Sequence, residues 1–370
     1  MIDFLKLPSP CYVLDEELLD RNLAIIDRVR RESGAEIIVA LKACAMWSIF
    51  PELARHSDGA TASSAAEARL VFEEFGRPAH TYAPVYTDRN IEEILRCSDH
   101  ITFNSVAQFE RFGPMALLRG ISCGLRINPQ YSPVETDLYN PCVPGSRLGV
   151  TADELKELPA GIDGLHFHVL HLRLALEAVE KHFGQYLDRI KWLNMGGGHL
   201  MTHAEYDCDE LIALLREFKA RHPHLQLILE PGSAFTWRTG YLVSTIEDLV
   251  ENAGVHTAML DVSFACHMPD CLEMPYKPAI VGAHEPAEGE KRWRMGGTSC
   301  LAGDYYGDWA FDHELKVGER IVFEDMIHYT MVKTTMFNGV AHPAIVIARR
   351  DGRIDVVREF GYEDFRNRMS

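Results

Sequence analysis

The stretch Ile37-Ile-Val-Ala-Leu-Lys-Ala-Cys44 places a lysine directly after five consecutive apolar residues. Such an apolar run predicts a strand that is buried on both faces, as in a parallel sheet. Lysine is almost never fully buried unless it is paired, and burial lowers the pKa of its amine by disfavouring the charged form. A desolvated Lys42 at the carboxyl end of this strand would suit a Schiff-base nucleophile, whereas a lysine that merely reaches solvent there would do no chemistry.

Strands and helices alternate on both sides of this stretch. The pattern predicts parallel β/α units, and about eight of them indicate a closed TIM-type (β/α)8 barrel over residues 15–235. The expected strands are 37–41, 58–63, 79–83, 101–103, 121–127, 164–170, 190–195 and 225–230. The expected helices include 88–96, 105–112, 151–158, 175–187 and 208–221. A long irregular segment, 128–147, is expected to be functional or lid-like.

The rhythm changes near Thr236, after which β-like runs follow one another without long helices between them. These runs are 242–246, 258–262, 292–295, 320–323, 344–348 and 354–358. They predict a second, C-terminal β domain over residues 236–370, which the N-terminal segment 1–14, with its short strand at 11–14, could join. The expected fold class is therefore α/β, a TIM-type barrel with a β domain.

Composition excludes several kinds of partner. The formal net charge of the 370 residues is −17, so a nucleic-acid backbone would be repelled. The nine cysteines form no C-x-x-C pair, which argues against a zinc ribbon or a redox motif. We expect no signal peptide and no membrane span, and therefore a cytoplasmic enzyme with reduced thiols.

Several chemically useful residues fall at expected strand ends, where β/α barrels carry their active sites. Lys42, Arg126 and Glu230 each lie at or near such an end, and His166 and His168 share one strand face. The glycines at 196–198 follow the strand ending at Met195. Their backbone N–H groups could face a phosphate, although the G-x-G-x-x-G spacing is missing.

A lysine, a phosphate loop and a carboxylate together suit pyridoxal 5'-phosphate. A carboxylate such as Glu230 would keep the ring nitrogen protonated, which favours decarboxylation over racemisation. The spacing of His166, His168 and His171 also allows a metal-dependent hydrolase on the same barrel. That alternative leaves Lys42 and the glycines without a role, so we expect no metal ligands at the site.

Longer motifs resemble the fold-type III pyridoxal-phosphate decarboxylases and, within them, the carboxynorspermidine/carboxyspermidine decarboxylases. The similarity runs almost from end to end. It rests on Pro8–Leu14, Ala40–Ala43, Ala62–Leu70, Gly164–His168, Asn194–His199, Leu229–Gly232, Cys266–Pro275, Gly297–Asp304 and Tyr329–Gly339. The last three segments are long and specific. The resemblance implies a lyase of polyamine biosynthesis that decarboxylates carboxynorspermidine and carboxyspermidine.

The resemblance also implies roles for residues around the cofactor. Lys42 forms the Schiff base, His168 stacks on the ring and Glu230 pairs with the pyridine nitrogen. The phosphate is held by Gly197, Gly198 and Tyr329. Glu67 and Arg126 are implied to line the barrel rim as supporting groups.

On the substrate side, the resemblance implies that Cys300 comes from the partner subunit and protonates the carbon that has lost CO2. Asp270 and Asp304 are implied to lie near the amino groups of the substrate. The active sites are then shared across a homodimer. The following residue is Leu301, where diaminopimelate decarboxylases typically carry an acidic residue, and this favours a substrate with an aliphatic polyamine tail.

Two departures from the family pattern concern the rim. The segment after His168, Val169–Glu177, is several residues shorter than usual, and Ser233 replaces a phosphate-binding arginine of ornithine-type relatives. A decarboxylase of ornithine or diaminopimelate remains the main alternative. A non-catalytic cofactor-binding barrel is a further one, although it would lack the β domain and its cysteine.

Overall fold

The computed structural model describes residues 2–133 and 140–370, so part of the irregular segment predicted at 128–147, residues 134–139, lies outside the described residues. The chain divides into two compact units. The barrel unit comprises residues 22–235, and the β unit comprises residues 1–21 and 236–370. Each unit is described on its own.

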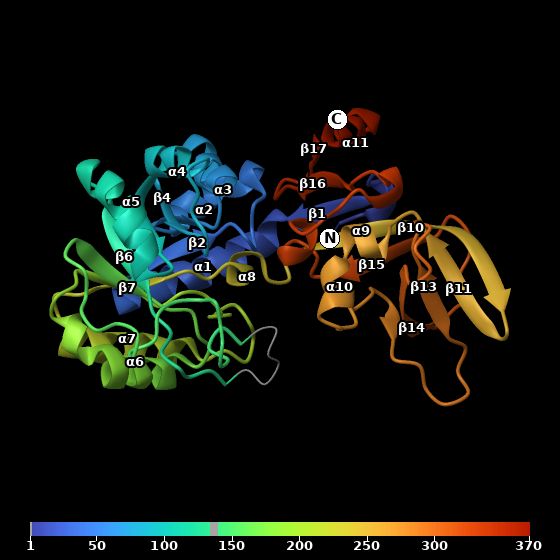
Figure 1. Cartoon of the computed structure of the whole chain (residues 1–370). Coiled ribbons are helices and arrows are strands. Elements are labelled where there is room, and N and C mark those ends of the chain that lie inside the picture. Colours follow the sequence, from blue (N-terminus) through green and yellow to red (C-terminus); the bar gives the residue numbers. More distant parts are fainter. Residues whose placement is uncertain (1, 134–139) are drawn as a thin grey trace. The chain divides into compact units, whose positions relative to one another are not determined.

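Eight parallel strands, β2 to β9, close into a barrel in sequence order (Figure 1). They are β2 (Glu36–Ala40), β3 (Gly59–Ala62), β4 (Ala79–Tyr82), β5 (Ser98–Phe103), β6 (Ser122–Arg126), β7 (Ile162–His166), β8 (Trp192–Asn194) and β9 (Gln226–Leu229). The predicted TIM-type barrel is therefore confirmed. All eight carboxyl ends meet at one rim, which fixes where a site can form.

Helix α1 precedes the first barrel strand, other helices follow individual strands, and the helices lie outside the barrel (Figure 1). They are α1 (Glu16–Ser33), α2 (Phe50–His56), α3 (Ala65–Leu70), α4 (Ile91–Cys97), α5 (Val106–Leu118), α6 (Leu172–Leu187), α7 (Cys208–Arg221) and α8 (Ser233–Thr236), with short turns η2 (Trp47–Ile49) and η3 (Val71–Phe75). Within the described ranges, no helix has both the length and the apolarity that a membrane crossing requires.

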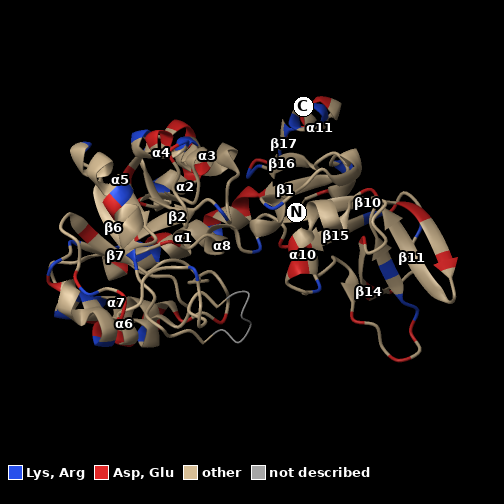
Figure 2. Cartoon of the chain, in the orientation of Figure 1, with Lys and Arg blue, Asp and Glu red and all other residues tan. Residues whose placement is uncertain are grey.

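Charges on the outer helices pair with one another. Figure 2 shows acidic and basic residues interspersed on α6 and α7. Arg221 of α7 lies 3.1 Å from Glu180 of α6 and 2.8 Å from Glu217 one turn away. Exposed pairs of this kind contribute little stability each, so the barrel depends on its interior packing.

The indole of Trp192 lies across two glycines on the neighbouring strands of the barrel. Gly124, Gly164 and Trp192 lie in register on the neighbouring strands β6, β7 and β8. A Cβ atom would come within 2.2 Å of the indole at Gly124 and within 2.0 Å at Gly164. Because interiors are close-packed, these strands need glycine where the large ring crosses them.

The β unit is built on one large mixed sheet. Its strand order is β12-β14-β13-β11-β10-β1-β16-β17, with β15 paired to β10. The strands are β1 (Cys11–Asp15), β10 (Gly240–Asn252), β11 (Val255–Leu260), β12 (Ala283–His284), β13 (Trp293–Gly296), β14 (Tyr305–Phe311), β15 (Arg320–Glu324), β16 (Ala344–Ala348) and β17 (Ile354–Arg358). β1 lies between β10 and β16, so the first strand of the chain is central in this sheet.

Short helices connect the strands of the β unit. They are η1 (Phe4–Lys6), α9 (Phe264–His267), α10 (Pro269–Glu273), η5 (Tyr329–Met331), η6 (Phe337–Gly339) and α11 (Tyr362–Met369). A buried cluster that includes Cys11, Val13, Val243 and Val346 forms part of its core.

Three local predictions are wrong. The strand predicted at 164–170 ends at His166 as β7, so His168 lies beyond it and the two histidines do not share a strand face. The predicted helix at 151–158 is a series of turns, because Thr151 and Glu154 form one capped turn and the chain meets Pro159 soon afterwards. The predicted helix ending at 112 continues to Leu118 as α5 despite Pro114. Its buried side chains, including Phe109, Phe112 and Ala116, offset the hydrogen bond that proline removes.

Candidate active site

Lys42 lies in the turn that follows β2, at the carboxyl end of the barrel. The N–H groups of Ala43 and Cys44 donate to the carbonyl oxygen of Ala40, which closes this turn. Solvent reaches the Lys42 side chain, so it is accessible and not sealed in the core. Desolvation by the surrounding protein still lowers the pKa of the Lys42 amine. Glu230 raises this pKa, and Arg126 lowers it further. An accessible amine with a lowered pKa suits Schiff-base chemistry.

Glu230 follows β9 and is 7% exposed. The side-chain amide of Asn194 donates to its Oε1 at 2.7 Å. Nε2 of His166 lies 3.6 Å from Oε2, a distance too long for a hydrogen bond. Burial alone would raise the pKa of Glu230, but His166, Asn194 and Lys42 together hold it well below the usual range. Glu230 therefore stays ionised at neutral pH.

His166 ends β7, opposite Arg126 of β6, and is 2% exposed. Burial lowers the pKa of His166, although Glu230 raises it, so a neutral imidazole faces the ionised carboxylate. The Tyr82 ring lies 5.1 Å from the His166 ring, and the guanidinium of Arg126 lies 4.6 Å from the Tyr82 ring. These contacts tie three strand ends to one another.

His168 lies two residues beyond the end of β7. The backbone N–H of Gly197 donates to its Nδ1 at 3.1 Å. Burial, together with Lys42, Arg126 and His166, lowers the pKa of His168 well below its ordinary value. The imidazole is therefore neutral and is oriented by the glycine turn, which leaves a flat uncharged face for an aromatic ring.

The turn at 196–198 has space only for glycine. Gly196 and Gly198 have φ values of +70° and +92°, which side chains rarely adopt. At Gly197 a Cβ atom would come within 2.6 Å of the Glu230 carbonyl oxygen and 3.2 Å of the His168 ring. The backbone of this turn is thus free to approach a ligand closely.

Glu67 and Arg126 also lie in the barrel unit. The carboxylate of Glu67 accepts from the Ser63 N–H at 2.6 Å, while the Glu67 N–H donates to Ser64 Oγ at 3.1 Å, an arrangement that caps α3. Burial raises the pKa of Glu67, although the Ser63 N–H and Lys42 lower it. Arg126 is 7% exposed and contributes a fixed cation near Lys42.

The shortened rim segment borders a pocket of about 700 Å³. Leu170, His171 and Gly198 are among the lining residues. His171 has a φ of +56° and precedes α6 without a side-chain cap, and Leu170 and Leu174 are 38% and 45% exposed. The segment therefore carries backbone strain and exposed apolar surface beside the glycine turn.

In the β unit, Cys300 is exposed, and its N–H donates to Asn338 Oδ1 at 2.9 Å. Asp304 is buried, and its two oxygens accept from the N–H groups of Ala265 and Ser299 at 3.0 and 2.9 Å. The Asp304 carboxylate therefore shapes the loop that carries Cys300. Its predicted contact with substrate stays a prediction.

Asp270, in α10, is buried, and only one of its two carboxylate oxygens has hydrogen-bond partners in the described structure. Its Oδ2 accepts from the hydroxyl groups of Tyr276 at 2.9 Å and Thr330 at 2.8 Å. Its Oδ1 has no hydrogen-bond partner among the described residues. The neighbouring Tyr329 has a φ of +32°, which is uncommon for a residue with a side chain and is typical of functional sites. An unpaired buried carboxylate oxygen is suited to a cationic ligand.

The structure thus gathers the predicted residues into two groups. Lys42, Glu67, Arg126, His168, Gly197, Gly198 and Glu230 share the barrel unit, and Asp270, Cys300, Asp304 and Tyr329 share the β unit. Sequence reasoning considered His166 only as a metal ligand of the alternative hydrolase, quoted Asn194 only as part of a motif, and missed Tyr82. Their signal was available, because each is the last residue of a barrel strand.

The barrel residues fit pyridoxal 5'-phosphate. The glycine turn offers a backbone cradle that a Cβ atom would fill, and Glu230 is an ionised carboxylate with a defined orientation. The accessible Lys42 amine lies in the same electrostatic network. By contrast, His166, His168 and His171 do not converge as a ligand group anywhere in the described part of the chain, so the metal-hydrolase alternative lacks its site.

Comparison with known proteins identifies the family of the chain. The family described as "Pyridoxal-dependent decarboxylase, C-terminal sheet domain" matches residues 11–327. The chain therefore belongs to the pyridoxal-dependent decarboxylases, and it is an enzyme that uses pyridoxal phosphate.

Particular relatives narrow the class. The chain is 56% identical to a carboxyaminopropylagmatine decarboxylase of Synechocystis sp., over 98% of this chain and 96% of the relative. It is 38% identical to the carboxynorspermidine/carboxyspermidine decarboxylase of Campylobacter jejuni, over 97% and 98% of the two chains. The crystal structure of the C. jejuni carboxynorspermidine decarboxylase with norspermidine superposes with a TM-score of 0.90 at 36% identity, covering 98% of this chain and 100% of that one.

Proposed function

We propose that this enzyme decarboxylates carboxynorspermidine and carboxyspermidine to norspermidine and spermidine in polyamine biosynthesis. The observation that carries the proposal is the barrel rim, where an accessible lysine lies in one electrostatic network with an ionised buried glutamate and a neutral histidine. The similarity to a carboxynorspermidine decarboxylase over the full length of both chains supports the choice of substrate.

Pyridoxal phosphate, when bound, supplies an electron sink for the pair of electrons left by CO2. In this proposal the Lys42 amine would anchor the cofactor, and the Glu230 carboxylate would hold a proton on the ring nitrogen. His168 would pack against the ring, and Gly197 and Gly198 would bind the phosphate through backbone N–H groups. Tyr329, Glu67 and Arg126 complete the proposed binding site.

The proton that replaces CO2 comes, in this proposal, from the Cys300 thiol. The thiol is exposed, and the Asn338 side chain fixes its loop. It would deliver the proton to the substrate α-carbon. Asp270 would bind a substrate ammonium group through its unpartnered Oδ1. Ammonium and carboxylate form a charge-assisted hydrogen bond, stronger than a neutral one.

We also propose a homodimer with shared active sites, in which the Cys300 loop faces the barrel rim of the partner. Leu301 and Phe337, which flank Cys300 and its partner Asn338, are 47% and 50% exposed. Exposed apolar side chains on adjoining segments are typical of an interaction surface. A cytoplasmic location stays a prediction, and it is supported by the nine described cysteines, which form no disulfide.

A second substrate deserves the same test. The relative at 56% identity is named for carboxyaminopropylagmatine, whose tail ends in a guanidinium group in place of an amine. Both kinds of tail are aliphatic and cationic, which fits, in this proposal, the apolar Leu301 and the unpartnered Oδ1 of Asp270. Diaminopimelate is disfavoured because it carries a second amino-acid head, which Leu301 cannot bind by charge.

The test is CO2 release from each candidate acid. Purified enzyme with pyridoxal phosphate is incubated with carboxynorspermidine, carboxyspermidine, carboxyaminopropylagmatine, diaminopimelate or ornithine. The proposal predicts the largest kcat/KM for the two carboxypolyamines. A larger value for carboxyaminopropylagmatine would establish the second candidate, and preference for diaminopimelate or ornithine would contradict both.

A further inference from the structure

The amino-terminal end of the barrel carries a second cluster of ligating side chains. His80 is the second residue of β4, and Asp99 and His100 are the second and third residues of β5. Lys42 follows the carboxyl end of β2, so this cluster lies at the opposite end of the parallel barrel. The proposed decarboxylation gives it no task.

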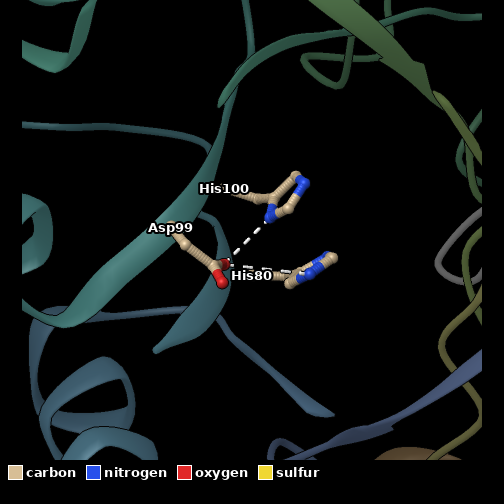
Figure 3. A group of neighbouring side chains, drawn as sticks. All are labelled: His80, Asp99 and His100. Carbon is tan, nitrogen blue, oxygen red and sulfur yellow. Dashed lines mark hydrogen bonds and ion pairs between the residues drawn. The ribbon is translucent and has the colours of Figure 1, made fainter. Parts of the chain in front are cut away.

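The three donor atoms converge (Figure 3). Asp99 Oδ1 lies 2.9 Å from His100 Nδ1 and 3.9 Å from His80 Nε2. All three donor atoms lie within 4.8 Å of one another. Across residues 2–133 and 140–370, no other set of three or more histidine, cysteine or acidic side chains meets this criterion. One carboxylate oxygen thus lies between two imidazole nitrogens.

A β-bulge produces this convergence. Consecutive side chains of a regular strand point to opposite faces, so Asp99 and His100 should not meet. The register between β4 and β5 shifts here: Ala79 pairs with Ser98, but His80 pairs with His100. Asp99 is therefore the extra residue of the bulge, and a bulge re-aims the side chain that it inserts. The chain departs from a regular strand where the cluster forms.

Neighbouring rings pack against the histidines of the cluster, and solvent still reaches its Asp99 side. The His80 and His100 rings stack with their centroids 4.0 Å apart, and the Trp192 ring packs edge-on against His100 at 5.7 Å. The side chains of His80 and His100 are 14% and 22% exposed, whereas that of Asp99 is 49% exposed. An ion could therefore enter from the Asp99 side without unfolding the barrel.

We propose that His80, Asp99 and His100 form a binding site for one late first-row divalent metal ion such as Zn²⁺. Imidazole nitrogen and carboxylate oxygen are suitable ligands for these ions, at bond lengths of about 2.0–2.2 Å. Ligand atoms around such an ion lie about 3.0–3.5 Å apart, so the 3.9 Å separation of His80 from Asp99 needs to close by roughly half an ångström. The ion would link β4 to β5, and water would complete its coordination.

The ion would stabilise the barrel and leave catalysis to the opposite rim. Binding to the folded state alone raises the melting temperature by mass action, by about 5 °C when free metal exceeds its Kd a hundredfold. The experiment uses cofactor-loaded enzyme that has been freed of metal with a chelator. Zn²⁺ is titrated in competition with a chromogenic chelator, and thermal unfolding is followed by circular dichroism.

The variants are Asp99→Asn and His100→Gln, and the control is His313→Gln, which alters an exposed histidine paired with Glu319 in the β unit. We expect one Zn²⁺ per chain, bound about 100-fold more weakly in both variants and unchanged in the control, since even indirect partners of a ligand contribute about 10–100-fold. Asp99→Asn should retain the metal-free melting temperature, because its side chain is half exposed.

Cobalt separates this site from the thiols. Co²⁺ bound by nitrogen and oxygen lacks the intense near-ultraviolet band of a cobalt–thiolate bond. Substoichiometric Co²⁺ should give weak visible bands only, and these should disappear in His100→Gln. A thiolate band, Zn²⁺ affinity that survives both variants, or no binding at submillimolar Zn²⁺ would each overturn the proposal.

Discussion

At the barrel rim, Glu230 is buried and hydrogen-bonded within its own chain, whereas the Cys300 loop, Gly297–Asp304, leaves Cys300 exposed. At the rim, Glu230 and His166 are 7% and 2% exposed, and the ionised Glu230 accepts a hydrogen bond from Asn194 beside a neutral His166. The Cys300 loop is exposed, and Asp270 retains an unpartnered oxygen in the described structure. The difference fits our proposal that one chain preorganises the cofactor site and that Cys300, the proposed proton donor, acts at the site of a partner chain.

The largest effect should follow from Lys42→Ala, which removes the amine on which the rim depends. We expect the visible absorbance of bound cofactor to disappear and kcat/KM to fall by about 10⁴-fold or more, since the proposed covalent anchor of the cofactor is lost. Absorbance and CO2 release measure the two effects. Lys191→Ala, an exposed lysine of the same unit, is the control. An unchanged spectrum would contradict the assignment of Lys42.

Cys300→Ala tests the role of the Cys300 loop. We expect turnover to fall by about 10³-fold, the usual contribution of a proton donor, while cofactor affinity changes little. Product formation and a cofactor titration measure these separately. Cys208→Ala in α7 is the matched control. Equal turnover in the two cysteine variants would remove Cys300 from the mechanism.

Glu230→Gln keeps the shape of the rim but removes its charge. We expect kcat to fall by about 10²-fold, because the ring nitrogen loses its ionic partner. The pKa of Glu230 is lowered in the folded state, so ionisation stabilises the fold above the unfolded value of about 4.3, and this contribution is lost as the pH falls below it.

Stability and pH therefore provide a second readout for this variant. The wild-type melting temperature should fall more steeply below about pH 4.3 than that of Glu230→Gln. Glu180→Gln, which alters a partly exposed ion pair, serves as the control for a simple loss of one carboxylate. Identical acid profiles for wild type and Glu230→Gln would show that the carboxylate is not held ionised by the fold.

Asp270→Asn should have the smallest effect. The amide can still accept hydrogen bonds from Tyr276 and Thr330, but it attracts an ammonium group less strongly than a carboxylate does. We expect KM for carboxynorspermidine to rise about tenfold with a smaller change in kcat, as loss of a charge-assisted hydrogen bond implies. Steady-state kinetics measure both values, and Asp312→Asn is the control. A change in kcat alone would argue against substrate binding at Asp270.

The local sequence pattern was enough to predict several helices and strands of the fold. Helix α7 and strands β16 and β17 have the predicted bounds, because each is an isolated run with one clear periodicity. A helix was wrongly predicted at 151–158, because the capping pair Thr151 and Glu154 and the apolar spacing resemble those of a helix. Only one turn forms there. Strand β14 was missed, since the aromatic and glycine residues of Tyr305–Phe311 do not alternate in polarity.

Site residues that lie at the end of a strand could be predicted from the sequence. The contacts between their side chains could not. Lys42 and Glu230 follow β2 and β9, and His168 follows β7. The contacts of Glu230 with Asn194 and His166 depend on the register of three strands. The hydrogen bonds of Asp304 to Ala265 and Ser299 and the bulge at Asp99 likewise arise only from tertiary pairing.

Mixing two inactive variants tests the comparison between rim and loop most directly. Lys42→Ala and Cys300→Ala proteins are unfolded together, refolded with pyridoxal phosphate, and assayed for CO2 release from carboxynorspermidine. If each active site combines the rim of one chain with the loop of its partner, half of the dimers are mixed and each has one intact site. Activity should then recover to about a quarter of the wild-type value. No recovery, in a mixture shown to contain mixed dimers, would contradict the shared site.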